Sequence, residues 1–246
     1  MWLDGTWPDG WSVRHVTETG STNDDLLIAA AAGAPDRSVL VADHQTAGRG
    51  RLDRRWEAPP GANLLVSMLF RTVPPRACTL TQRVALAAVD ACGAVAGVDA
   101  VLKWPNDLLV DDRKLAGILA QRAPDGSIVV GLGLNVGWAP DGAVSLRSAV
   151  SVEGSEPDVD VPTPRDLLVP FLTAFDALPD DIGTRYRVAL STLGRRVEVQ
   201  VPGGRIDGRA VEIDDDGRLV VVDARGLTHS LDVGDVVHVR DAGPPA

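Results

Sequence analysis

Hydrophobic and polar positions change their spacing several times along the chain, and each change predicts the boundary of an element. Residues 11–18 alternate well enough for a strand, and the apolar run 38–45 predicts a buried strand. Between them, Ser21, Thr22 and Asn23 offer capping oxygens for the start of a helix. The N-terminal region is therefore expected to run strand, helix, strand.

The centre of the chain is dense in short apolar runs. Its connections are only a few residues long, which favours antiparallel pairing because parallel neighbours need long crossovers. A helix is expected at 80–97, and strands are expected at 62–70, 101–104, 107–110, 114–121 and 127–136.

The third quarter of the chain contains a predicted connection and two predicted helices. Residues 139–162 are rich in Pro, Gly, Asp and Ser with little periodicity, which predicts an exposed connection. Helices are expected at 163–178 and 184–193, the first interrupted or kinked at Pro170.

After Leu193 the helix signal disappears. Short strands alternate with turn sequences such as PGG and DDDG, which predicts a small barrel of about fifty residues. We therefore expect two domains, residues 1–190 and 191–246. The five strands are expected at 195–201, 206–213, 218–223, 227–232 and 235–240.

Composition narrows the class of protein. The 246 residues are 45% hydrophobic and 24% charged, as expected of a globular chain with a real core, and the net charge of −10 argues against general nucleic-acid binding. No signal-like leader or membrane-length apolar run is visible, so a cytoplasmic protein without a membrane partner is expected. Cys78 and Cys92 lie in one helical-looking segment, too far apart for a disulfide, and are expected to be small core residues.

One basic segment interrupts this acidic chain. Residues 48–56 read GRGRLDRRW, which puts four arginines into nine residues. Glycine lets the backbone approach a ligand, and arginine offers forked donors to carboxylate or phosphate oxygens. The segment predicts an irregular, anion-binding loop, and the alternative is a solvated basic loop.

Lysine is almost absent, which makes its positions informative. The chain has two lysines, Lys103 and Lys114, against twenty-two arginines. A lysine ammonium is a compact point charge that suits a reacting centre, although arginine-rich coding bias would leave two lysines as well. Asn106 and Asp107 lie between them, directly after a proline. Their polar groups either face a pocket or simply belong to an ordinary turn sequence. The two lysines are expected at the same end of adjacent strands.

Glycines occupy alternate positions of the segment GLGLNV at 131–136. Glycine weakens a strand, so this pattern marks close approach by a ligand or by another backbone. A tightly packed core strand explains it equally well.

Taken in order and spacing, six segments resemble the bacterial biotin protein ligases: STN at 21–23, Gln45, GRGRLDRRW, KWPNDLLV, RKLAGIL and GLGLNV. The resemblance runs from about residue 15 to 240. It implies an α+β catalytic domain with a mixed, largely antiparallel sheet and helices, akin to class II aminoacyl-tRNA synthetases, followed by an SH3-like β-barrel. It also implies ATP-dependent formation of biotinyl-5′-AMP and transfer of biotin to a lysine of the biotin carboxyl carrier protein.

The resemblance implies roles for individual residues. Those expected at biotin are Ser21, Thr22, Asn23, Gln45, Gly48, Arg49, Gly50, Arg51, Lys114 and Gly117. Those expected at ATP, which would arrive with Mg²⁺, are Arg51, Arg54, Trp56, Lys103, Asn106 and Asn135. The reacting groups would be contacted by Lys114, Arg49 and Arg51, with Asp107 as a hypothetical base in the transfer step. No separate metal site is assignable.

The chain departs from the family pattern at the third glycine of the arginine segment, where Asp53 stands. About fifteen residues precede the resemblance, too few for a winged helix-turn-helix, so no operator binding is expected. A lipoate-type ligase remains as an alternative, although its RRxxGGG pattern is missing. A non-catalytic binding module is the other alternative, and monomer and homodimer are both left open.

Overall fold

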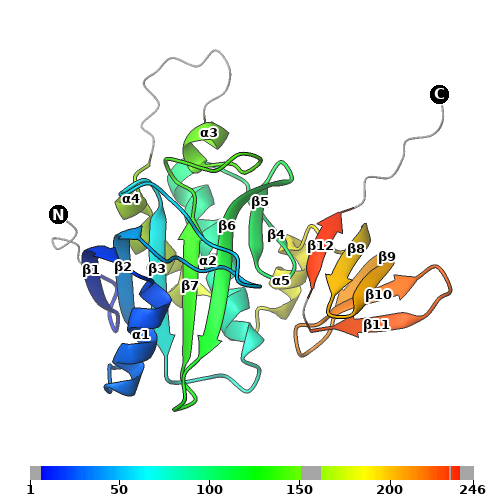
Figure 1. Ribbon diagram of the computed structural model, residues 1–246, viewed down its shortest axis with the longest axis horizontal. Coiled ribbons are helices and arrows are strands. Elements are labelled where there is room, and N and C mark those ends of the chain that lie inside the picture. The colour runs from blue at the N-terminus through cyan, green and yellow to red at the C-terminus, as the bar shows by residue number, and fades with distance from the viewer. Residues whose placement is uncertain (1–6, 151–161, 233, 239–246) are drawn as a thin grey trace.

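The structure is a computed structural model that describes residues 7–150, 162–232 and 234–238. Its larger part is a seven-stranded sheet in the order β1-β2-β3-β7-β6-β5-β4 (Figure 1). Strand β1 is parallel to β2, and every other neighbouring pair is antiparallel. The expected mixed, largely antiparallel sheet is therefore confirmed. The strands are β1 Ser12–Thr19, β2 Ser38–Gln45, β3 Leu64–Phe70, β4 Val101–Lys103, β5 Asp107–Val110, β6 Arg113–Arg122 and β7 Ile128–Leu134.

Helices cover both faces of this sheet. Helix α1 (Thr22–Ala31) lies in front, whereas α2 (Cys78–Ala96) and α4 (Pro164–Ala177) pack against each other behind it (Figure 1). Side chains alternate along the strands, so one set of buried residues faces α1 and the other joins the large core around α2 and α4. Helix α1 begins where it was expected, with the Ser21 hydroxyl accepting a hydrogen bond from the Asp24 amide.

A second sheet packs beside the β4 edge of the first (Figure 1). Its order is β11-β10-β9-β8-β12, with all neighbours antiparallel. Within the described residues, β11 and β12 form no ladder with each other, so closure of the expected barrel is not observed. Its strands are β8 Arg196–Val201, β9 Gly204–Ile213, β10 Leu219–Asp223, β11 Thr228–Leu231 and β12 Asp235–His238.

The two sheets share contacts near the expected boundary at residue 190. The Trp104 backbone amide donates to Thr192 Oγ1 at 3.1 Å, and its indole nitrogen donates to the Gly217 carbonyl at 3.0 Å. Helix α5 (Gly183–Ala189) ends before the expected residue 193 because the Ser191 amide donates to the Leu102 carbonyl of β4 at 2.8 Å. The chain there joins the first sheet before the second begins.

Three expectations along the chain need correction. The connection predicted over 139–162 contains helix α3 (Leu146–Val150), and Val144 and Leu146 are fully buried, while residues 151–161 lie outside the described part. Helix α4 is not interrupted at Pro170, since its buried apolar face packs against α2, while a kink there stays a prediction. Cys92 is buried as expected, but Cys78 is only half-buried.

Candidate active site

A cavity of about 470 Å³ lies over the middle of the first sheet and reaches β12 of the second. Nearly all residues expected at biotin or ATP line it; Gly48 lines a neighbouring cavity behind the arginine segment instead. Parts of α1, β2, β3, β4, β5, β6, β7 and β12 therefore meet at one site. The expected residues that line it are Ser21, Thr22, Asn23, Gln45, Arg49, Gly50, Arg51, Arg54, Trp56, Lys103, Asn106, Asp107, Lys114, Gly117 and Asn135.

One end of the cavity is uncharged and polar. Gln45 Oε1 accepts from the Thr22 amide at 2.8 Å and from the Thr22 hydroxyl at 2.9 Å. The fully buried Ser67 hydroxyl lies 2.7 Å from the Thr22 hydroxyl and 2.6 Å from Asn23 Oδ1. Two hydroxyl protons thus serve three contacts, so one contact lacks a proton at any moment. This end is suited to a ligand with its own N–H and C=O groups.

The sheet beneath this end requires glycine. A Cβ at Gly131 of β7 would overlap Asn23 Oδ1, so only a glycine lets the asparagine side chain lie flat on the strand. The Asn23 amide nitrogen then donates to the Leu119 carbonyl at 3.1 Å. Glycine at this position serves close approach, which was one of the two interpretations of GLGLNV.

Residues 48–56 form neither a helix nor a strand, as expected of a loop, and an isolated bridge between Arg49 and Arg55 folds them into a hairpin-like loop, the arginine hairpin. The Gly50 amide donates to the Arg54 carbonyl at 2.7 Å, and the Arg54 amide closes the turn on the Arg51 carbonyl at 3.2 Å. Leu52 and Asp53 both have left-handed φ, +55° and +57°, as a type I′ turn requires. Aspartate tolerates this conformation better than most residues, so Asp53 is compatible with the turn that a glycine would favour.

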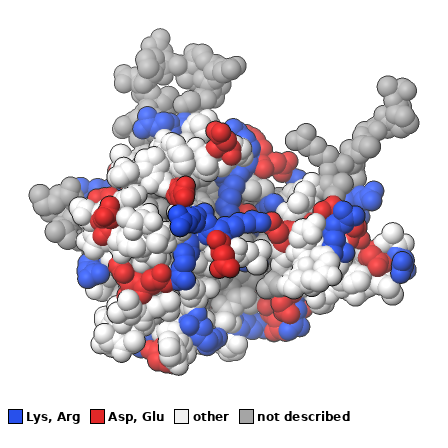
Figure 2. Space-filling view, in the orientation of Figure 1, with Lys and Arg blue, Asp and Glu red and all other residues white. Residues whose placement is uncertain are grey.

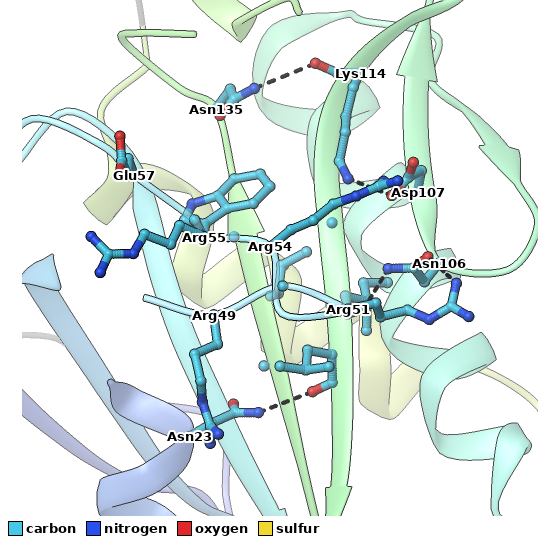
Figure 3. Close-up of a pocket in the computed structure, with 18 of the residues that line it drawn as sticks. Asn23, Arg49, Arg51, Arg54, Arg55, Glu57, Asn106, Asp107, Lys114 and Asn135 are labelled. Atoms are coloured by element: carbon cyan, nitrogen blue, oxygen red, sulfur yellow. Dashed lines mark hydrogen bonds and ion pairs between the residues drawn. The ribbon is translucent and has the colours of Figure 1, made fainter. Parts of the chain in front are cut away.

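Three arginines of this hairpin are tied to elements on both sides of it, and Figure 3 shows one of them, Arg51, beside Asn106. Arg49 is paired with Asp24 of α1, and Arg54 is paired with Asp235 of β12. Arg51 donates to Asn106 Oδ1 at 3.1 Å, and burial lowers the pKa of its guanidinium. The hydrogen bond from Arg54 lowers the pKa of the Asp235 carboxyl.

Both lysines reach the same cavity, but from strands that are not adjacent, because β5 lies between β4 and β6. Lys114 Nζ lies 2.6 Å from Asp107 Oδ1. Asp107 stands opposite Lys103 on one side and opposite Gly117 on the other. The expectation of a common site is met, whereas that of adjacent strands is wrong.

Trp56 closes the hairpin and lies on the floor of the cavity. A Cβ at Gly133 would overlap its indole, and a Cβ at Gly117 would lie 3.1 Å from the ring. Lys114 Nζ is 5.7 Å from the ring centroid, within cation–π range. The indole N–H is buried without a hydrogen-bond acceptor among the described residues. A ligand that supplies an acceptor would remove the cost of this buried donor.

Asn135 has a different environment from the other expected residues. It is 2% exposed, and its amide nitrogen donates to the Lys114 carbonyl at 3.3 Å and the Val144 carbonyl at 3.1 Å. Its oxygen accepts from Asn63 at 3.2 Å. These bonds fix the backbone of Lys114, while contact with a nucleotide stays a prediction.

Several residues at the site were not expected from the sequence. Ser67 was detectable as the polar residue within the apolar strand LLVSMLF. Asp235 and Trp138 also line the cavity, and nothing in the local sequence marks either one.

The site is positive in an acidic protein. Figure 2 shows blue side chains gathered at the centre of one face, where the hairpin crosses the sheet. Such a cluster would bring together anionic groups that repel each other in water. Among the described residues, no group of three or more His, Cys, Asp and Glu side chains could hold a metal ion, and none of the described helices is long and apolar enough to cross a membrane. The cations that line the cavity, from Arg49, Arg51, Arg54, Arg55, Lys103 and Lys114, outnumber the carboxylates of Glu57, Asp107 and Asp235.

Comparisons with known proteins agree with this chemistry. The biotin/lipoate A/B protein ligase family matches residues 16–137, and the biotin protein ligase C-terminal domain matches residues 192–239. A biotin--[acetyl-CoA-carboxylase] ligase of Mycobacterium tuberculosis is 41% identical over 84% of this chain and 82% of its own length. A Paracoccus denitrificans protein of the same name is 36% identical over 68% of this chain and 74% of its own length.

A solved structure shares the fold. The biotin protein ligase of Aquifex aeolicus, in complex with biotin and ATP, superposes with a TM-score of 0.76. The alignment covers 94% of this chain and 99% of that chain, at 23% identity. Both sheets are included in a match of this extent.

Proposed function

Because the chain belongs to the biotin protein ligases, we propose that this cavity carries out both half-reactions of that activity and that the acceptor is a biotin carboxyl carrier domain. In the first, a biotin carboxylate oxygen attacks the α-phosphorus of ATP, giving biotinyl-5′-AMP and pyrophosphate. In the second, a carrier lysine amine attacks the acyl carbon and AMP leaves. The observation that carries the proposal is the meeting of an uncharged polar end and a cation cluster in one cavity.

The polar end supports binding of the ureido ring. Its N–H and C=O groups need matched partners when buried, and Ser21, Thr22, Asn23 and Gln45 supply both donors and acceptors. Ser67 belongs to the same set because its hydroxyl touches Thr22 and Asn23. A ureido N–H would supply the proton that one of the three hydroxyl contacts lacks.

The cation cluster supports the adenylation step. A carboxylate and a phosphate repel each other, so the protein contributes mainly by holding them together and by stabilising the charge that develops. Arg49, Arg51 and Lys114 are the proposed partners of the carboxylate and the α-phosphate. Lys103 and Arg54 would stabilise the departing pyrophosphate. Mg²⁺ would arrive with the nucleotide and be held chiefly by its phosphates.

Asp107 is proposed as the base of the transfer step. Its carboxylate is 21% exposed and paired with Lys114, so an incoming amine can reach it from the cavity. When the phosphate of the adenylate engages the Lys114 ammonium, Asp107 becomes free to accept the proton of the attacking amine.

Trp56 is proposed to move from its position on the floor of the cavity and cover the bound intermediate. Its flat ring already lies against the glycines of β6 and β7, and its buried N–H lacks an acceptor among the described residues. Closure by this ring would keep water from the mixed anhydride, which water would otherwise hydrolyse.

The test combines the protein with ATP, a carrier domain and either biotin or lipoate, and measures the mass of the carrier. A gain equal to a biotinyl group, dependent on ATP, is the expected result. Transfer of lipoate instead of biotin would favour the lipoate-type alternative, and transfer of neither would favour a non-catalytic module.

A further inference from the structure

The two ligand-binding ends of the cavity are joined by a single side chain, that of Gln121 on β6. Its Oε1 accepts a hydrogen bond from Asn23 Nδ2 at 2.8 Å and another from Arg49 Nη2 at 3.3 Å. Asn23 belongs to the uncharged polar end, whereas Arg49 belongs to the arginine hairpin. One oxygen therefore contacts a residue from each end.

Helix α1 supplies a second link between the same two ends. Arg49 Nη2 is also paired with Asp24, the residue that follows Asn23 in the first turn of α1. Asn23 is in turn held by Ser67, whose hydroxyl lies 2.6 Å from Asn23 Oδ1. A continuous path of polar contacts thus runs from buried Ser67 through Asn23 and Gln121 to the arginine.

Gln121 does not belong to the ligand cavity itself. It is half-buried and lines the neighbouring cavity behind the arginine hairpin, and it is absent from the lining of the ligand cavity. Its two partners, Asn23 and Arg49, both line the ligand cavity. The role open to it is therefore that of a positioning residue.

We propose that Gln121 is a positioning residue that couples recognition of the ligand ring by Asn23 to placement of Arg49 for the ligand carboxylate. This rests on the proposed function, in which the ring and the carboxylate belong to one biotin molecule. A ring that fixes the Asn23 amide also fixes the Gln121 oxygen, and the guanidinium is then held in place before the carboxylate arrives. Prior placement lowers the conformational entropy lost on binding.

Both contacts use Gln121 as an acceptor, which sharpens the test. Gln121→Glu keeps an oxygen at the same distance from the backbone, whereas Gln121→Met keeps the length and removes the acceptor. Arg122→Met is the matched control, because Arg122 is the next residue of β6, is exposed and donates to the Gly126 carbonyl, away from the site. Gln121→Ala serves as a second acceptor-free variant if the methionine protein does not fold.

Binding of biotin and of biotin carboxamide is measured by calorimetry for the wild-type protein and each variant. The two ligands share the ring and differ in the charge of the head group, so the ratio of their dissociation constants reports the use of Arg49. We expect the dissociation constant for biotin carboxamide, divided by that for biotin, to fall about tenfold in Gln121→Met, the effect of a hydrogen bond to a charged group, and to be kept in Gln121→Glu and Arg122→Met.

An unchanged ratio in Gln121→Met would overturn the proposal, as would an equal loss in Gln121→Glu, since the acceptor would then not be the cause. These results leave biotin binding by the wild-type protein intact. A wild-type protein that binds neither ligand would instead refute the proposed function and remove the premise of the coupling.

Discussion

Asp235 of β12 is paired with Arg54 of the arginine hairpin, although 181 residues separate them in the chain. The second sheet thereby fixes one side of the hairpin, while Asp24 of α1 holds the other. Neither sheet alone builds the site. Most of the cavity lining comes from the first sheet, and Asp235 and Val236 come from β12 of the second.

The first prediction concerns this link. Asp235→Asn removes the charge that holds Arg54, so we expect the KM for ATP to rise about two- to fivefold, in line with a partly exposed ion pair. Asp207→Asn is the control, because Asp207 is an exposed aspartate of the same sheet paired with Arg205 on its own strand. Steady-state kinetics with saturating biotin measure both variants. A similar KM for ATP in Asp235→Asn and in the wild-type protein would show that the pair does not position the hairpin.

The second prediction concerns Lys114. Lys114→Ala removes the ammonium that lies beside Asp107, and we expect biotinyl-5′-AMP formation to fall at least about a hundredfold. Lys114→Arg should not restore it, since a guanidinium is bulkier than an ammonium and the space above Gly117 is narrow. Pyrophosphate release measures the rate, and circular dichroism checks the fold. Normal adenylate production by Lys114→Ala would exclude Lys114 from the reacting centre.

The third prediction concerns the floor of the cavity. Gly133→Ala places a methyl group where the Trp56 indole lies, so the ring must move and we expect the dissociation constant for biotin to rise about tenfold or more. Gly93→Ala is the matched control: this glycine of α2 is exposed with open space around it, and alanine should raise the free energy of unfolding by about 1 kcal/mol. Unaltered biotin binding by Gly133→Ala would mean that the position of Trp56 does not affect the ligand.

The fourth prediction concerns the turn of the arginine hairpin. Asp53 has a φ of +57°, so Asp53→Gly should stabilise the closed hairpin by about 1 kcal/mol and slow tryptic cleavage at its arginines. Asp53→Val should act in the opposite direction, because β-branched residues disfavour positive φ. Limited proteolysis with mass analysis of the fragments compares the two variants. Equal cleavage rates would show that the turn does not control opening of the hairpin.

The fifth prediction concerns acid stability. Burial lowers the pKa of His238 from its ordinary 6.5 to about 4, and the ring is 11% exposed. Between these values the unfolded chain binds the proton and the folded chain does not, so stability rises with pH across this interval. His238 should therefore leave stability intact above about pH 6.5 and remove up to about 3 kcal/mol as the pH falls to about 4.

Urea unfolding of the wild-type protein and of His238→Gln between pH 4 and pH 7 measures this contribution. We expect the pH dependence in the variant to be flatter by that amount. Parallel curves for the two proteins would assign the acid sensitivity to other groups.

Much of the first sheet could be predicted from the sequence, because its strands are apolar runs separated by short turns. The prediction failed where tertiary contacts decide the outcome. Residues 139–150 lack periodicity, yet Val144 and Leu146 are buried in the large core, and the Leu146 amide donates to the Asn135 carbonyl at 2.9 Å. Leu52 is an unusual residue for a tight turn that requires a left-handed φ, and the hairpin forms around it nevertheless.

The site was predictable where one segment carries several polar or basic residues. Two such segments, the arginine segment and residues 103–114, contribute side chains to the same cavity. Asp235 was not predictable in this way, since it is one of many aspartates and acquires its partner only when the second sheet packs beside the hairpin. Gln121 is likewise an ordinary residue of an exposed strand end until α1 brings Asn23 to it.

Both lysines of the chain lie in the cavity, and this placement has a practical consequence. Reagents that acylate primary amines usually modify a protein at many surface points. Here every side-chain amine belongs to the ligand cavity, and Lys114 is 39% exposed. Apart from the N-terminal amine, such a reagent would react only with lysines of the cavity. The extent of its reaction would report whether a ligand occupies the cavity, without any engineered label.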